Sequence, residues 1–143
     1  MARGVARTAD GVTAHRSLLP EGWPRPRGYA NGIAAEGRMV FTGGVVGWDI
    51  KERIPDGFTA QFEQLLANTV AILAEGGAAP EHIVRMTWYV TDRDAYLAAL
   101  SDIGATYRRL MGRNYPAMAV VQVVALVEAA ALIEIETTAV VPA

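Results

Sequence analysis

Two adjacent C-terminal stretches decide the fold, MAVVQVVAL at 118–126 and LIEIETTAVV at 132–141. The second stretch sends its two glutamates to one face and its two isoleucines to the other, as a strand with one solvated face does. The first stretch is apolar at nearly every position, so both of its faces need cover. We therefore expect two paired strands at the end of the chain, joined by a turn at 127–131.

Upstream of these strands, the hydrophobic pattern predicts two helices separated by one strand. Apolar residues recur at helical spacing over 62–73 and again over 96–110. Between them, HIVRMTWYVT at 82–91 has the β-branched and aromatic composition of a strand. The further strands expected before the first helix span 29–35, 38–42 and 45–50. This order predicts the α+β class, with one mixed six-stranded sheet and two helices on one of its faces.

The second face of such a sheet also needs cover. A large apolar face left open on a monomer would promote aggregation. We expect another subunit to cover it, since obligate interfaces resemble a divided core. The alternative is that the N-terminal segment folds back over this face.

Residues 1–27 contain three prolines and little core-forming sequence, so we expect an irregular extension there and one domain at 28–143.

Composition excludes several classes of function. The chain has 143 residues and no cysteine, which rules out disulfides, thiol nucleophiles and cysteine-ligated metals. Its net charge of −2 argues against nucleic-acid binding. No apolar run is long enough for a membrane span and the N-terminus does not look like a secretory signal, so we expect a cytoplasmic protein with no membrane partner. His15 and His82 are the only histidines, and no metal site is expected from them.

Short motifs follow one another in an order typical of one protein family. They are Gly28-Tyr29, MVFTGG at 39–44, Gln61 and Asn68, GGAAPEHIV at 76–84, WYVTD at 88–92, Pro116-Ala117, and IEIE at 133–136 followed by Ala139. Together they resemble the RidA/YjgF family of reactive-intermediate (enamine/imine) deaminases. The resemblance implies a chorismate-mutase-like fold and a homotrimer with a cleft between each pair of neighbouring subunits. It also implies hydrolysis of enamines and imines to a keto acid and ammonia, without metal or cofactor.

The resemblance assigns roles to four residues of this chain. Glu134 positions or activates the attacking water, and Tyr29 lines the cleft. Gly44 brings its backbone close to the ligand, and Val120 contacts the ligand through its own backbone. Three of them have a plainer interpretation: Glu134 as a solvated strand carboxylate, Tyr29 as a half-buried strand aromatic, and Gly44 as part of a bulge. At Val120 any residue type could serve, because only its backbone is involved.

Two departures from the family pattern bear on the substrate. Met118 stands where the deaminases carry an arginine that grips the substrate carboxylate, and the family's asparagine in the second helix has its best match at Gly104. Methionine is a common flexible core residue and has no donors to replace a guanidinium. We therefore expect poor activity on 2-aminoacrylate and similar imino acids. A loop arginine, at position 25, 27 or 53, is a candidate replacement cation.

Two main functions remain open from the sequence, beside a third in which the trimer is purely structural. The first is a RidA-like hydrolase of a small enamine or imine, with the substrate site in inter-subunit clefts. The alternative is a non-catalytic trimer of the same fold that binds a small metabolite or a partner protein. Loss of turnover on replacing Glu134 would distinguish the enzyme from the binding protein.

Overall fold

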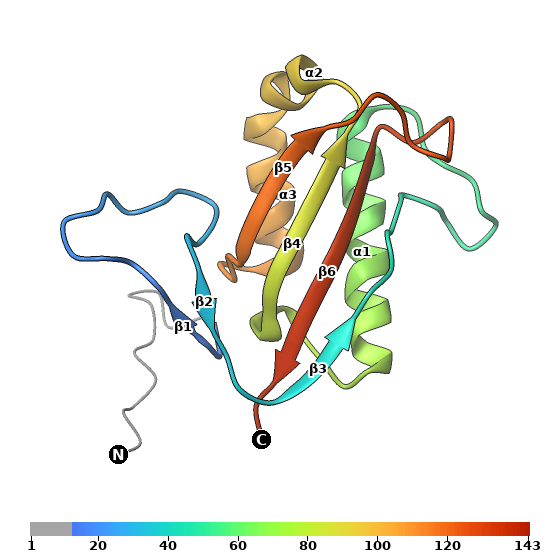
Figure 1. Cartoon of the computed structure of the whole chain (residues 1–143). Coiled ribbons are helices and arrows are strands. Elements are labelled where there is room, and N and C mark those ends of the chain that lie inside the picture. The colour runs from blue at the N-terminus through green and yellow to red at the C-terminus, as the bar shows by residue number, and fades with distance from the viewer. Residues whose placement is uncertain (1–12) are drawn as a thin grey trace.

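The computed structural model describes residues 13–143, in which the strands form two sheets (Figure 1). The larger sheet has four strands in the order β3-β6-β4-β5, and the smaller pairs β1 with β2. The elements are β1 (Arg16–Ser17), β2 (Ile33–Ala34), β3 (Arg38–Phe41), α1 (Phe58–Glu75), the 3-10 turn η1 (Pro80–His82), β4 (Ile83–Val90), α2 (Arg93–Ala98), α3 (Leu100–Met111), β5 (Ala117–Gln122) and β6 (Ile133–Val141).

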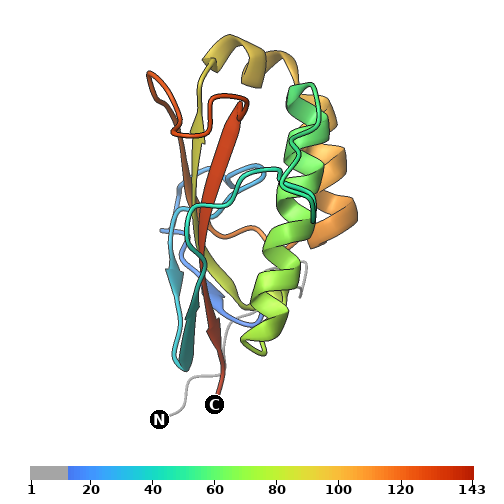
Figure 2. The ribbon, with the colours of Figure 1, turned by 90° about the vertical axis from the view of Figure 1, so that its right-hand side faces the viewer.

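Helices α1 and α3 lie on one face of the four-stranded sheet, and residues 13–143 place no helix on its other face (Figure 2). The core fills the space between these helices and the sheet. It includes Phe62 and Leu66 from α1, Met86 from β4, and Ile133 and Ile135 from β6, all completely buried. Each such side chain contributes about 1.5–3 kcal/mol by leaving water. The predicted α+β class, with its helices on one face, is confirmed.

The C-terminal strands do not pair with each other, so the expected hairpin was wrong. Strand β4 lies between them, parallel to β5 and antiparallel to β6. The chain reaches β5 from β4 through the helices, which makes these two strands parallel neighbours. It then crosses the end of β4 through residues 123–132, held by Val123 N donating to Val90 O and by Thr91 N donating to Leu132 O. Positions 123–126, expected in a strand, belong to this loop.

The single six-stranded sheet was also wrong, because the strands form one sheet of four and another of two. Strand β2 pairs with β1, whereas β3 pairs antiparallel with β6. Gly37, between them, has φ 146°, and a Cβ there would lie 2.1 Å from Val141 O. The backbone thus passes against the end of β6 instead of turning back on itself. The strand expected at 45–50 is reduced to a bridge between Val45 and Ile135.

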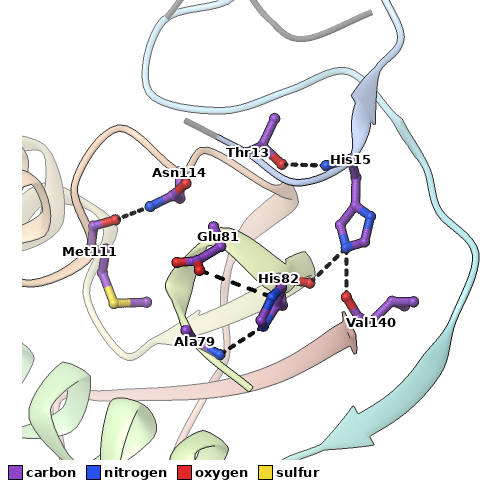
Figure 3. Close-up of polar contacts among 8 residues, drawn as sticks. All are labelled: Thr13, His15, Ala79, Glu81, His82, Met111, Asn114 and Val140. Carbon is purple, nitrogen blue, oxygen red and sulfur yellow. Dashed lines mark hydrogen bonds and ion pairs between the residues drawn. The ribbon is translucent and has the colours of Figure 1, made fainter. Parts of the chain in front are cut away.

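The first described residues form a strap over one end of the sheet (Figure 3). Ala14 N donates to Glu81 O at 3.0 Å. His15 is 3% exposed, and its Nε2 donates to Val140 O at 2.7 Å and to His82 O at 3.2 Å. The strap therefore joins the end of β6 to the start of β4. Residues 1–12 of the predicted extension lie outside the described part of the chain.

The sheet face away from the helices, which we call the open face, mixes apolar and charged side chains. Met39 and Phe41 of β3 are 56% and 62% exposed. Tyr89 of β4 and Glu134 and Glu136 of β6 share this face, because their positions alternate with the buried core residues. Within residues 13–143, no helix is long and apolar enough to span a membrane.

Candidate functional site

Glu134 and Gly44 meet at the start of β6. Val45 and Ile135 exchange two backbone hydrogen bonds of 2.9 Å in an antiparallel bridge, so Gly44 and Glu134 lie on the same face, diagonally across from each other. A Cβ built on Gly44 would lie 2.9 Å from the carboxyl carbon of Glu134. Only glycine leaves this carboxylate undisturbed. Glu134 is half-buried, and among the described residues its carboxylate has no hydrogen-bond or ion-pair partner.

Gln61 and Asn68 of α1 hold the loops around this point. The Gln61 side chain donates to Ala130 O at 3.0 Å and accepts from Leu132 N at 2.7 Å, which fixes the loop before β6. Asn68 donates to Trp48 O at 2.7 Å, which fixes the loop after Gly44. These two residues, singled out as family motifs, therefore position the backbone that carries the Glu134 site.

Tyr89 and Glu136 form a second polar pair beside Glu134. The Tyr89 hydroxyl donates to Glu136 Oε1 at 2.7 Å. This hydrogen bond raises the pKa of Tyr89, and burial and the charges of Glu136 and Glu134 add to the effect, whereas Arg85 opposes it. The phenol thus stays protonated throughout the physiological range. Sequence reasoning missed this pair, because only the register of β4 against β6 reveals that the two side chains meet.

The other predicted site residues lie elsewhere in the chain. Met118 and Val120 of β5 point to the helix side, where they pack against the core. Tyr29 is 43% exposed and stands beside the start of β5, where Ala30 N donates to Pro116 O at 2.9 Å. Strand β4 separates this group from Glu134. The predicted residues therefore divide into a β6 half-site (Gly44 and Glu134) and a β5 half-site (Tyr29, Met118 and Val120).

Neither the histidines nor Arg53 adds to these half-sites. Besides the His15 contacts, His82 Nδ1 accepts from Ala79 N at 2.9 Å, so both imidazoles serve local structure. Arg53 pairs with Asp49 in its own loop, Nε to Oδ2 at 3.0 Å. The hydrogen bond from the Arg53 backbone lowers the pKa of Asp49 below its usual value, and one from the Lys51 backbone adds to the effect. In residues 13–143, no three His, Asp or Glu side chains gather as metal ligands would.

Comparisons with known proteins agree with the fold and with the motifs. The family model described as Endoribonuclease L-PSP matches residues 24–141. Protein DfrA of Myxococcus xanthus is 30% identical over 117 residues, covering 79% of this chain and 86% of that protein.

Two solved structures extend the likeness. The Rid family protein YyfB from Yersinia pestis is 30% identical with a TM-score of 0.79, covering 89% of this chain and 98% of its own. E. coli TdcF, solved with bound serine, is 30% identical with a TM-score of 0.63, covering 84% and 91%. These matches cover most of this chain, in sequence and in fold. They show that the chain belongs to the RidA/YjgF/UK114 family.

Proposed function

We propose that this protein hydrolyses a small enamine or imine, with Glu134 activating the attacking water. One observation carries the proposal: a half-buried carboxylate without a protein partner among the described residues, set against the bare backbone of Gly44. A carboxylate in such a place can accept a proton from water, and the glycine leaves room for a ligand beside it. Membership of the RidA/YjgF/UK114 family supports the same chemistry.

The reaction needs only proton transfers and one water. An enamine takes a proton on carbon to become an iminium ion, whereas an imine is protonated on nitrogen. Water then adds to the carbon of the C=N bond while Glu134 accepts one of its protons, which gives a carbinolamine. Glu134 returns that proton to nitrogen, and ammonia leaves as the C–N bond breaks. The hydroxyl group then loses its proton to solvent and becomes the carbonyl, which gives back the solvent proton taken up in the first step. One water is consumed, and the carboxylate is regenerated.

We further propose that the site is completed by a second copy of the chain in a homotrimer. In one chain the β6 and β5 half-sites lie on strands separated by β4. They can enclose one small molecule only if the β5 half-site of a neighbour closes over the β6 half-site. The exposed Met39 and Phe41 on the open face support such assembly, because a monomer would leave them in water.

Met118 directs the reaction away from imino acids that carry a carboxylate. Its thioether offers no hydrogen-bond donor, whereas a carboxylate is normally held by a charged fork of N–H groups. On the same face of β6, the next side chain beside Glu134 is Glu136, another carboxylate. We propose no ribonuclease activity, although the description of the family includes that term. The carboxylates of Glu134 and Glu136 would repel a phosphate backbone.

The test is a Glu134→Gln variant assayed on two probes. One probe is the imine of benzaldehyde and methylamine, followed by aldehyde release above the spontaneous rate. The other is the imino acid produced from phenylalanine by an amino-acid oxidase. We expect turnover to fall by about 10²–10⁴-fold, the usual contribution of a general base. Glu75→Gln, at an exposed position on α1, is the matched control. Unchanged turnover in Glu134→Gln would rule out the proposed role and favour a binding protein.

A further inference from the structure

Tyr89, Val121 and Glu134 form a continuous surface on the open face, which we call the Tyr89 platform. Tyr89 is directly opposite Glu134 in the β4–β6 pair and directly opposite Val121 in the β4–β5 pair. Neighbouring strands lie about 4.8 Å apart, so the three side chains stand next to one another. Val121 is 42% exposed and Tyr89 is half-buried. The platform thus places an aromatic ring and an aliphatic side chain beside the proposed catalytic carboxylate.

The aromatic ring of the platform is held in place. The Tyr89 hydroxyl donates to Glu136 Oε1 at 2.7 Å, and Glu136 stands diagonally across from it, two residues after Glu134. This contact ties the polar edge of the ring and leaves its face available to a ligand. A side chain that is already ordered loses little conformational entropy when a ligand binds, so the platform is prepared for binding.

Charge around the ring has one dominant sign. From β6, Glu134 and Glu136 face Tyr89, and β5 contributes no ionisable side chain. On β4 itself, Arg85 shares this face, and its charge acts on Tyr89 in the opposite sense to the two carboxylates. Two carboxylates therefore act on the ring against one cation, whose effect on Tyr89 is smaller than that of either carboxylate. Such a surface attracts a cation and repels an anion.

We propose that the Tyr89 platform selects protonated imines carried on an apolar or aromatic body. The cationic C=N group lies over the ring face with Glu134 as its counter-charge, and the body lies against Val121. Cations bind aromatic ring faces through the ring quadrupole. An imino acid brings a carboxylate to the same place, where the two carboxylates outweigh the single cation, Arg85. This inference rests on the proposed function and names its substrate class.

Equilibrium binding of three stable probes of similar shape tests it on the full chain. The probes are benzylammonium, benzyl alcohol and benzoate, which differ in charge, titrated by calorimetry. We expect benzylammonium to bind best and benzoate worst. Tyr89→Leu keeps apolar area but removes the ring, so it should weaken benzylammonium about tenfold, the size of a partly desolvated cation–π contact. The same variant should leave benzyl alcohol nearly unchanged.

Two further variants separate the contributions. Tyr89→Phe keeps the ring and should retain most of the benzylammonium affinity, and Glu134→Gln should weaken it as Tyr89→Leu does. Leu97→Ala, at an exposed position on α2, is the control. Thermal unfolding of each variant shows that it is folded before binding is compared.

Benzoate binding as tightly as benzylammonium, or no loss in Tyr89→Leu, would overturn the inference, as would the absence of binding by all three probes. These results leave hydrolysis by Glu134 to be judged separately by turnover. Conversely, charge-selective binding with no turnover on either imine would contradict the proposed function alone.

Discussion

Gly44 lies so close to Glu134 that one added methyl carbon would meet its carboxyl carbon at 2.9 Å. The atom in the way is the end of a flexible side chain. A Gly44→Ala variant should therefore fold, with a loss of about 1 kcal/mol or less in unfolding free energy. The added methyl group should push the Glu134 carboxylate away from the position in which it activates water. We expect kcat/KM to fall at least tenfold, the size of about 1.4 kcal/mol in transition-state stabilisation.

Gly43→Ala is the control for this variant, because a Cβ at Gly43 would meet nothing within 4 Å. Turnover and urea unfolding of the two variants should be measured together. Equal activity of Gly44→Ala and Gly43→Ala would show that the close approach of residues 44 and 134 has no catalytic role.

Met118 offers a gain-of-function test of substrate choice. Met118→Arg introduces a donor fork into the β5 half-site, so hydrolysis of the imino acid from phenylalanine should rise about tenfold. Met118→Leu conserves volume and should change stability by less than about 1.5 kcal/mol, with no gain on this substrate. If the unmodified chain already hydrolyses the imino acid as fast as Met118→Arg does, the role given to Met118 is wrong.

Phe41 tests the assembly. A charge on this exposed side chain of β3 cannot be buried at an interface without a large desolvation cost. Phe41→Glu should therefore remain folded but dissociate to monomers and lose turnover, as measured by light scattering after gel filtration. Leu97→Glu, on α2, should keep the assembly of the unmodified chain. A monomeric unmodified chain with full activity would contradict the proposed trimer.

His15 tests the strap. Its Nε2 donates to the carbonyls of Val140 and His82, both at the end of the sheet. His15→Ala leaves these acceptors without their donor and opens space, so it should cost about 1–3 kcal/mol of unfolding free energy. Urea unfolding measures this loss, with Arg16→Ala on the exposed side of β1 as control. A loss no larger than that of Arg16→Ala would mean that the strap contributes little.

Periodicity and composition predicted the helices and most strands, because those signals are local. The partner of β5 was not predictable in the same way. The apolar sequence of β5 would suit pairing with β4 or with β6. That β5 pairs with β4 depends on a crossover through two helices and on a loop across the end of β4. The same limit explains why Met118 and Glu134 were placed on paired strands, whereas β4 separates them.

The site residues that were predicted from the sequence are those marked by local motifs. Gly44 and Glu134 were identified by their motifs, and the structure brings them into contact. Tyr89 lies within the WYVTD motif, yet its hydrogen bond to Glu136 depends on strand register, which no local pattern determines. Contacts between distant strands were therefore the part of the site that required the structure.

Subunit mixing tests directly whether two chains share each site. Glu134→Gln disables the β6 half-site, and Tyr29→Ala disables the β5 half-site at an exposed residue. Each variant alone should be nearly inactive. After denaturation and refolding of an equal mixture, about a quarter of the clefts in a ring of head-to-tail contacts combine two intact halves. We predict that activity returns to about that fraction of the unmodified protein. A mixture no more active than the two variants separately would show that each site belongs to a single chain.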